Sequence, residues 1–251
     1  MYLPSYRAER SRTNPLDNFT STADTVEKMT QLVWGNINSP YVHAALNQIL
    51  EGMISKSGNK TIQPSTLDWC RSIYWWVKRH VKFSEDERTL STLFGLHDME
   101  DGKELLLSPS FLLQMPYPTG DCDDFSTLIA TLLVAAGVPH VFFCTIAADG
   151  REPNNFTHVY VKVQLNDGSM VPLDASHGKY PGWEHKEQYS SANWAVTSNA
   201  AQAHASTAPV KVVPQASPLT SSSLENVLNN YVKQQAVDFL GVNPMAFLGI
   251  L

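Results

Sequence analysis

Three residues of this chain, Cys122, His158 and Asp174, could together form a thiol active site. Cys122 lies in the stretch GDCDDF at 120–125, directly before a segment with the apolar periodicity of a helix, so we expect it in the first helical turn. There the unpaired backbone N–H groups and the positive end of the helix dipole favour a thiolate. The same N–H groups can stabilise the oxyanion of an acyl-transfer reaction. This setting predicts a nucleophile.

A thiolate nucleophile also needs a base, which a third group must orient. His158 lies in the strand-like run FTHVYV at 156–161, and Asp174 ends the run VPLD at 171–174. Between these runs, the turn sequence NDG at 166–168 predicts a hairpin. In a hairpin the two side chains can share one face of the sheet, and the pairing register decides whether they do. His158 is the predicted base and Asp174 its orienting group.

The acidic flank of Cys122 works against its ionisation. Asp121, Asp123 and Asp124 would raise the pKa of the thiol unless they point away or cap the helix. The alternative is an unreactive buried thiol, but a core cysteine is not expected between aspartates at a polar helix start. We therefore favour the catalytic interpretation of Cys122.

The other residues that could do chemistry have structural interpretations. Cys70 and Cys144 lie within apolar patterns and are expected in the core. His177 follows Asp174 closely and could line a substrate cleft, but it is interpreted as a loop histidine. Three scattered cysteines make neither a disulfide framework nor a zinc site, so no metal and no cofactor are predicted.

The elements that must position these residues fall into two groups along the chain. Helical periodicity comes first, and short runs rich in Val, Phe, Tyr and Thr follow it. N-terminal helices packed on an antiparallel sheet make an α+β arrangement. The predictions are helices at 22–36, 40–52, 65–83 and 121–136, a loop at 84–103, a short helix or turn at 105–113, and strands at 140–147, 156–165 and 170–174.

Composition divides the chain into four parts. Residues 1–20 are polar and interrupted by proline, which predicts an irregular N-terminal arm. Residues 21–189 hold the predicted catalytic domain with its N-terminal helical part. Residues 190–223 are rich in Ala, Ser and Pro, a linker composition. Residues 224–251 combine a predicted helix with the apolar end PMAFLGIL, which we expect to dock on another surface.

The order and local sequences of the three candidate residues resemble a known family. The helix start GDCDD, the strand HVYV and the strand end LD, in the order Cys, His, Asp, resemble the transglutaminase-like superfamily of papain-related thiol enzymes. The helix end WWVK at 75–78 and the segment SPS at 108–110 also resemble that family, and the likeness covers roughly residues 66–185. The resemblance implies a papain-like α+β core and acyl transfer through a thioester.

The resemblance assigns roles to individual residues. Cys122 is the implied nucleophile, His158 the general base and acid, and Asp174 the orienting carboxylate. An oxyanion contributor is implied upstream, and Gln114 and Tyr117 are its candidates, although prolines at 116 and 118 interrupt the local pattern. Microbial and phage members imply hydrolysis of peptide or isopeptide bonds more often than cross-linking, so a peptide or protein is the expected substrate.

Net charge and hydropathy limit the kinds of partner and the cellular location that we expect. A formal net charge of −6 offers no basic surface for a phosphate backbone, so no nucleic-acid partner is predicted. No apolar run reaches the length of a membrane span, and no signal peptide is expected at the N-terminus. We expect the protein in the cytoplasm of the producing cell, with incorporation into a virion implied by the phage-type resemblance.

A second hypothesis is a structural protein of a virus particle that keeps this fold without turnover. The arm at 1–20 and the tail at 224–251 have no evident place in the expected core. Neighbouring subunits of an assembly would order such segments, so other subunits are the expected partners of arm and tail. A virion-borne enzyme would combine both hypotheses.

Overall fold

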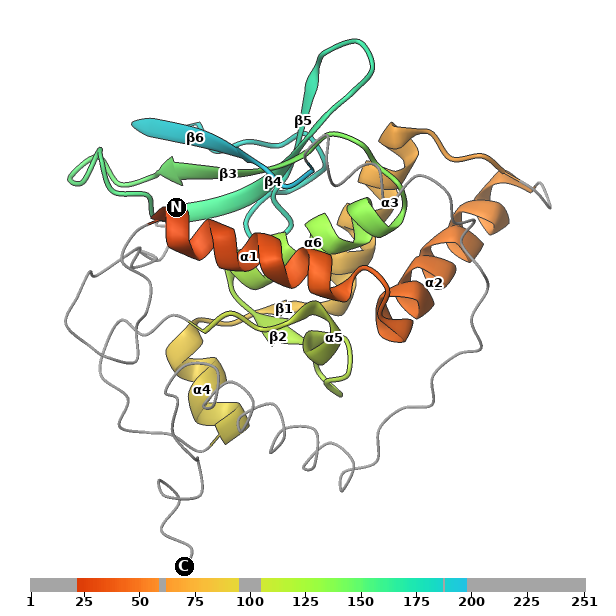
Figure 1. The fold of residues 1–251 in the computed structure, drawn as a ribbon, viewed down its shortest axis with the longest axis horizontal. Coiled ribbons are helices and arrows are strands. Elements are labelled where there is room, and N and C mark those ends of the chain that lie inside the picture. Colours follow the sequence, from red (N-terminus) through yellow and green to blue (C-terminus); the bar gives the residue numbers. More distant parts are fainter. Residues whose placement is uncertain (1–21, 59–61, 95–104, 187, 198–251) are drawn as a thin grey trace, which may run out of the picture.

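A computed structural model describes residues 22–58, 62–94, 105–186 and 188–197 of the chain (Figure 1). The predicted arm and the predicted C-terminal helix and tail lie outside these residues, as does the predicted linker beyond residue 197. Within the described residues, helices and an antiparallel sheet occur together, which confirms the predicted α+β class.

The helices agree with the predicted ones in part. α2 continues past its predicted end at Gly52, which lies exposed on the helix, and stops where Gly58 adopts a φ of 70° and donates its N–H to the Ile54 carbonyl. α4 occupies part of the predicted loop at 84–103, so that prediction is wrong for its residues; the segment is mostly charged and polar, which suggested a loop, although its few apolar residues recur at helical spacing. The helices are α1 (Thr22–Asn36), α2 (Pro40–Ser57), α3 (Thr66–His80), α4 (Asp86–Phe94), α5 (Pro109–Leu112) and α6 (Cys122–Ala135).

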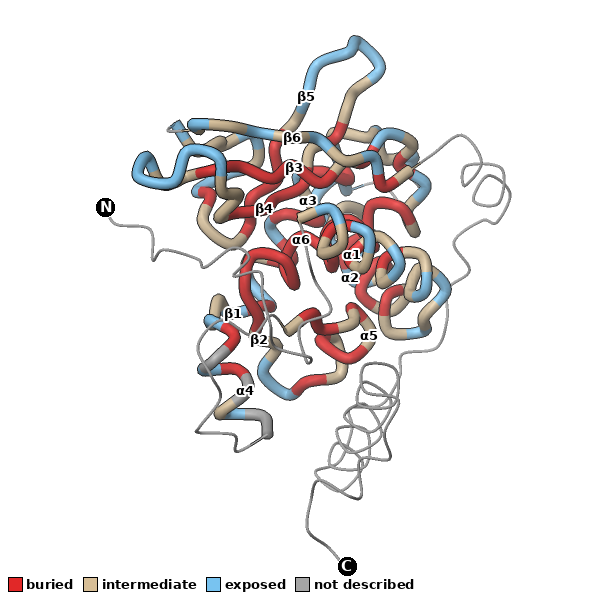
Figure 2. Tube along the Cα trace, turned by 60° about the vertical axis from the view of Figure 1, so that its left-hand side comes forward, coloured by how far each residue is buried: buried red, intermediate tan, exposed pale blue. Residues whose placement is uncertain are grey.

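Capping boxes set the start of α3 and α6. The Ser65 hydroxyl accepts the N–H of Asp68 at 3.2 Å, and the Asp68 carboxylate accepts the N–H of Ser65 at 2.9 Å. Asp121 and Asp124 form the equivalent pair at α6. Because α6 is buried along most of its length, it forms the centre of the core, and Figure 2 shows it enclosed by the other elements.

A four-stranded antiparallel sheet covers one side of α6 (Figure 1). The order is β5-β4-β3-β6, and the pairing of β4 with β5 confirms the predicted hairpin. Val159, Val161 and Val163 of β4 belong to the core that contains α6. The strands are β3 (Val141–Ala147), β4 (His158–Gln164), β5 (Met170–Leu173) and β6 (Ser190–Ala195).

β6 corrects the predicted linker, which was wrong for residues 190–195. This strand pairs with β3, with Phe143 opposite Trp194. Its residues alternate between half-buried and exposed, and most are small and polar. The strand is held by main-chain hydrogen bonds to β3 and by the Trp194 side chain. Neither contribution can be recognised from composition alone.

A short parallel pair links the end of α3 to the start of α6. β1 (Lys82–Phe83) pairs with β2 (Thr119–Gly120), and this pair lies on the side of α6 away from the four-stranded sheet (Figure 1). Phe83 is paired with Gly120 in this register. The pairing therefore places Phe83 beside the turn that leads into Cys122.

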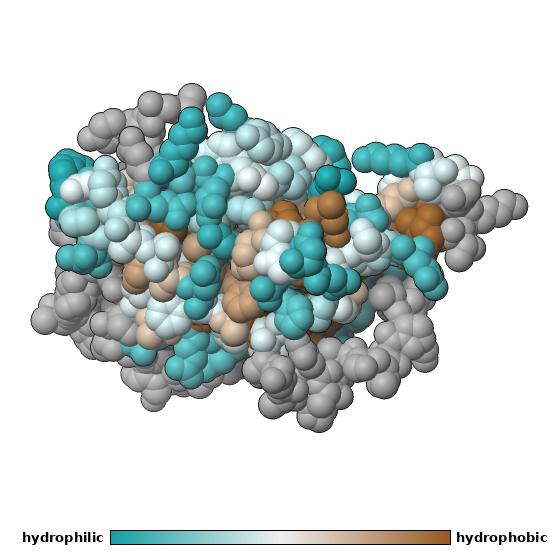
Figure 3. Space-filling view, turned by 90° about the horizontal axis from the view of Figure 1, so that it is seen from above, coloured by the Kyte–Doolittle hydropathy of each residue, from teal (hydrophilic) through white to brown (hydrophobic). Residues whose placement is uncertain are grey.

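The surface is largely polar where the sheet faces outward. Figure 3 shows hydrophilic side chains over most of this face, with apolar ones in small separate areas. Of the helices in the described ranges, none combines the length and the apolar character needed to cross a membrane.

Candidate active site

Cys122 is the first residue of α6, as predicted, and it is fully buried. Asp121 is the N-cap and accepts the N–H of Asp123 at 3.2 Å. Asp124 accepts the N–H of Asp121 at 3.3 Å and, with its other oxygen, the N–H of Leu107 at 2.8 Å. Two of the three flanking aspartates therefore cap the helix. Capping was one of the two conditions, with pointing away, under which these carboxylates would not raise the pKa of the thiol.

The turn before Cys122 leaves no room for a side chain at residue 120. A Cβ on Gly120 would lie 2.3 Å from Oδ2 and 2.6 Å from Cβ of Asp124. The glycine therefore allows the Asp124 carboxylate to fold back over the helix start. The same carboxylate connects this turn to the segment that contains Leu107, which is buried.

His158 and Asp174 lie on one face of the hairpin. In the antiparallel register Val161 is opposite Leu173, so the next residue after Leu173 falls on the face of β4 that carries Tyr160 and His158. The His158 Nε2 atom lies 2.8 Å from the Asp174 Oδ2 atom, and both side chains are buried. The register that the sequence could not determine thus brings the two predicted partners into a hydrogen bond.

Asp174 is held by further donors besides His158. Its Oδ1 atom accepts the Ser176 hydroxyl at 2.8 Å and the main-chain N–H of His177 at 2.9 Å. Burial opposes ionisation of Asp174, but the positive charge of His158 and these hydrogen bonds outweigh it and hold the pKa of the carboxyl well below its usual range. An ionised carboxylate only accepts hydrogen bonds, so Nε2 of His158 carries a hydrogen. Nδ1 is then the ring nitrogen that this hydrogen bond does not use.

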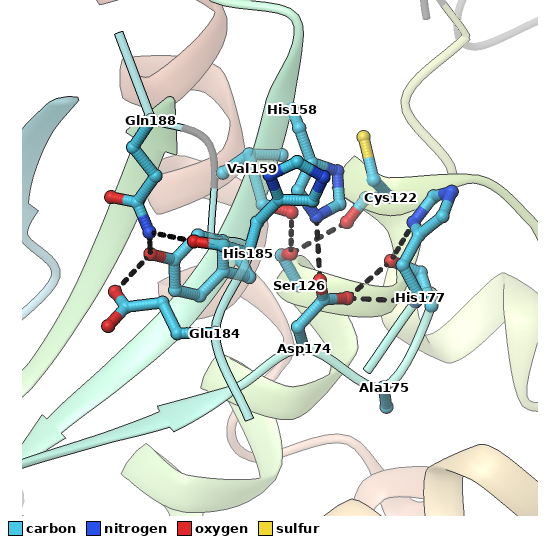
Figure 4. Close-up of polar contacts among 12 residues, drawn as sticks. Cys122, Ser126, His158, Val159, Asp174, Ala175, His177, Glu184, His185 and Gln188 are labelled. Atoms are coloured by element: carbon cyan, nitrogen blue, oxygen red, sulfur yellow. Dashed lines mark hydrogen bonds and ion pairs between the residues drawn. The ribbon is translucent and has the colours of Figure 1, made fainter. Parts of the chain in front are cut away.

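Ser126 joins the helix of Cys122 to the strand of His158. Its hydroxyl oxygen lies 2.6 Å from the Cys122 carbonyl oxygen and 3.1 Å from the Val159 carbonyl oxygen. The main chains of the predicted nucleophile and of the residue after the predicted base therefore approach the same side chain. Figure 4 shows the Cys122 thiol beside the His158 ring, with Asp174 beyond the ring.

His177, which the sequence interpretation treated as a loop histidine, lies against the side chains of the site. Its ring centroid lies 4.8 Å from that of His158, with the rings at 83°, and 5.0 Å from that of Phe83. Burial and the charge of His158 lower its pKa to about 4, so the ring is neutral near pH 7. Its position three residues after Asp174 in a polar turn was the available signal, since such a turn can fold back on the carboxylate.

The two oxyanion candidates have other surroundings. The Gln114 side-chain amide donates to the Ser110 carbonyl at 2.8 Å. Tyr117 is 85% exposed. Their roles as oxyanion donors stay predictions.

A polar cluster on β4 continues the site along the strand. The Tyr160 ring lies 5.8 Å from the His158 ring at an interplanar angle of 26°, and its hydroxyl donates to Glu184 at 2.5 Å. Lys162 forms an ion pair with the same Glu184 oxygen at 2.5 Å. These contacts hold the segment after the Asp174 turn against the sheet, as Figure 4 shows for Glu184 and Gln188.

Two groups of side chains in the described residues have donor atoms close enough together to hold a metal ion. One consists of His158, Asp174 and His177, and the other of the buried residues Asp86, Asp121 and Asp124; within each group the donor atoms lie within 4.8 Å of one another. In the first group, the hydrogen bond between His158 and Asp174 already uses one donor atom of each. Nitrogen and carboxylate donors suit zinc, and a carboxylate trio suits calcium or magnesium.

Comparison with known proteins adds no relative to this picture. No family model matches the sequence, and no curated protein matches it.

Proposed function

We propose that the protein is a thiol hydrolase of the transglutaminase-like type, with a papain-like core, that cleaves peptide or isopeptide bonds through a thioester on Cys122. The observation that carries the proposal is the buried hydrogen bond of 2.8 Å between His158 Nε2 and Asp174 Oδ2, next to a cysteine at the start of a helix. A buried, charged orienting group is what a histidine base requires. A purely structural histidine in a sheet does not require it.

In the first step, His158 Nδ1 takes the thiol proton of Cys122, and the thiolate sulfur attacks the carbonyl carbon of the substrate. The positive end of α6 stabilises the oxyanion that forms. Asp174 stabilises the imidazolium by its charge and orientation. It does not take the proton on Nε2, because the pKa of its carboxyl is low.

In the second step, the imidazolium gives its proton to the leaving amine, and the carbon–nitrogen bond breaks. The product is a thioester between Cys122 and the acyl part of the substrate. Water, deprotonated by the now neutral His158, then attacks the thioester carbonyl. The carbon–sulfur bond breaks, the acyl part leaves as a carboxylic acid, and the thiolate takes the proton back from His158. An amine in place of water would give cross-linking by the same chemistry.

The test is alkylation of the full-length protein by iodoacetamide at neutral pH, with the modified residue located by mass spectrometry. We expect Cys122 to react although it is as buried as Cys70, because His158 supplies a base; Cys70 has no such partner in the proposal, and burial raises the pKa of its thiol to about 12. Cys122→Ala should abolish labelling, and the matched control Cys70→Ala should leave it unchanged. Labelling that persists in Cys122→Ala, or a wild-type Cys122 that does not react, would refute the proposal.

A further inference from the structure

The turn that follows Asp174 brings His177 back onto the carboxylate. The N–H of Gly178 donates to the Asp174 carbonyl at 2.8 Å. A Cβ at Gly178 would lie 2.3 Å from that carbonyl oxygen, so the close return of the chain depends on glycine. Lys78 of α3 donates to the Ala175 carbonyl at 3.0 Å and ties the turn to the helices. The residues before and after His177 are therefore both held by hydrogen bonds, through the Ala175 carbonyl and the Gly178 N–H.

The hydrogen-bond network assigns the hydrogen on the His177 ring. The Ser176 oxygen lies 2.8 Å from Asp174 Oδ1 and 3.0 Å from His177 Nδ1. The ionised carboxylate can only accept, so the single hydroxyl hydrogen of Ser176 goes to Asp174. The Ser176 oxygen then accepts from His177, whose Nδ1 must carry a hydrogen. His177 thus donates to Ser176, and Ser176 donates to Asp174. The other oxygen of Asp174 accepts from His158.

We propose that His177 is a positioning residue for the reaction assigned to Cys122: its Nδ1–H group fixes the Ser176 hydroxyl, and together they keep the Asp174 carboxylate turned toward His158. This inference rests on the proposed function. Two of the three hydrogen bonds to Asp174 come from this pair, one from the Ser176 hydroxyl and one from the His177 main chain. The neutral ring also packs edge-on against both His158 and Phe83.

Two substitutions separate the donor of His177 from its ring. His177→Asn keeps an N–H donor near the position of Nδ1 but loses the ring. His177→Phe keeps a ring against His158 and Phe83 but has no donor. If His177 acts through packing alone, His177→Phe should behave like the wild type. If it acts through its donor, as proposed, His177→Asn should behave like the wild type and His177→Phe should not.

The experiment measures the rate of iodoacetamide modification of Cys122 in the full chain between about pH 5 and pH 9, a range that spans perturbed and free thiols. When Asp174 is free to turn away, the imidazolium is less stable and the thiolate forms at higher pH. We expect the midpoint of the profile to move up by about one unit in His177→Phe, which is tenfold less thiolate at a given pH. His177→Asn should keep the wild-type midpoint. Ser176→Ala breaks the same chain with a small change of volume, so it should shift the midpoint as the phenylalanine variant does.

The results distinguish this inference from the proposed function. A wild-type midpoint close to that of a free cysteine, about pH 8.5, would refute the proposed function itself. A low wild-type midpoint that stays unchanged in His177→Phe and Ser176→Ala would overturn only the positioning role. An upward shift in His177→Asn without one in His177→Phe would assign the effect to the ring and would also overturn it. Should His177→Phe fail to fold, an unchanged midpoint in Ser176→Ala overturns the inference by itself.

Discussion

Asp174 determines the state of His158 through its charge. The side chain is 2% exposed, and it stays ionised because several donors surround it. A charged carboxylate can only accept, so it selects the His158 tautomer with hydrogen on Nε2 and leaves Nδ1 available to take a proton. At the scale of residues, the reaction proposed for Cys122 depends on the His158 tautomer that Asp174 imposes.

The amide Asp174→Asn tests this dependence with little change of shape. Its oxygen can still accept from Ser176 and His177, but its NH2 group then faces Nε2 of His158. His158 has to accept there and carry its hydrogen on Nδ1, where it can no longer take the thiol proton. We expect alkylation of Cys122 at neutral pH to slow by about two orders of magnitude, followed by intact-mass spectrometry.

The matched control for this change is Asp167→Asn, an exposed carboxylate in the turn between β4 and β5. It should react at the wild-type rate. Equal rates for the two amide variants would show that the charge of Asp174 does not control the thiol.

The start of α6 acts as one unit at the scale of elements. Gly120 belongs to β2, Asp121 and Asp124 cap the helix, and Asp124 also binds the N–H of Leu107. These contacts place Cys122 at the first helical position and hold it there. A change anywhere in the unit should therefore affect both stability and the placement of the thiol.

Gly120→Ala should lower the free energy of unfolding by about 1–3 kcal/mol, because its Cβ would overlap the Asp124 side chain in a buried turn. Urea unfolding measures the effect. The control is Gly52→Ala inside α2, where a Cβ meets nothing within 4 Å; it should stabilise the protein by about 0.5–1 kcal/mol through helix propensity. A Gly120→Ala protein as stable as the wild type would mean that the turn can open away from Asp124.

At the scale of the whole molecule, β6 connects the two ends of the described chain. The Trp34 indole of α1 donates to the Val196 carbonyl at 3.1 Å, and the Trp194 indole donates to the Thr145 hydroxyl at 3.0 Å. The first helix of the described chain is therefore bonded to the residue that directly follows its last strand.

Trp194→Ala measures what β6 contributes. Trp194 is half-buried against the core, so we expect a loss of about 2 kcal/mol in the free energy of unfolding, below the cost of a fully buried tryptophan. Cys122 alkylation should stay at the wild-type rate, since β3 separates β6 from the β4–β5 hairpin that carries His158 and leads into Asp174. Tyr117→Ala, at an exposed position, serves as control and should change stability by less than about 0.5 kcal/mol. No loss in Trp194→Ala would indicate that residues 190–195 behave as the linker their composition suggests.

Local patterns in the sequence were sufficient for much of this description. The bounds of α1 and the start of α6 follow from periodicity and capping residues, which act within a few positions of the chain. The hairpin of β4 and β5 follows from its turn sequence in the same way. Cys122, His158 and Asp174 could be proposed because each lies in a local setting that suits its role.

The tertiary structure decided what depends on contacts between distant segments. The register of β4 against β5 determines that His158 and Asp174 share a face, and a shift by one residue would separate them. β6 is held by β3, a strand far from it along the chain, so its own residues carry a weak signal. His177 looks like any loop histidine until the turn after Asp174 folds back and its Nδ1 meets Ser176. The sequence by itself thus determined the three candidate residues, and folding determined which of their neighbours could make them work, because hydrogen bonds depend on distance in space rather than along the chain.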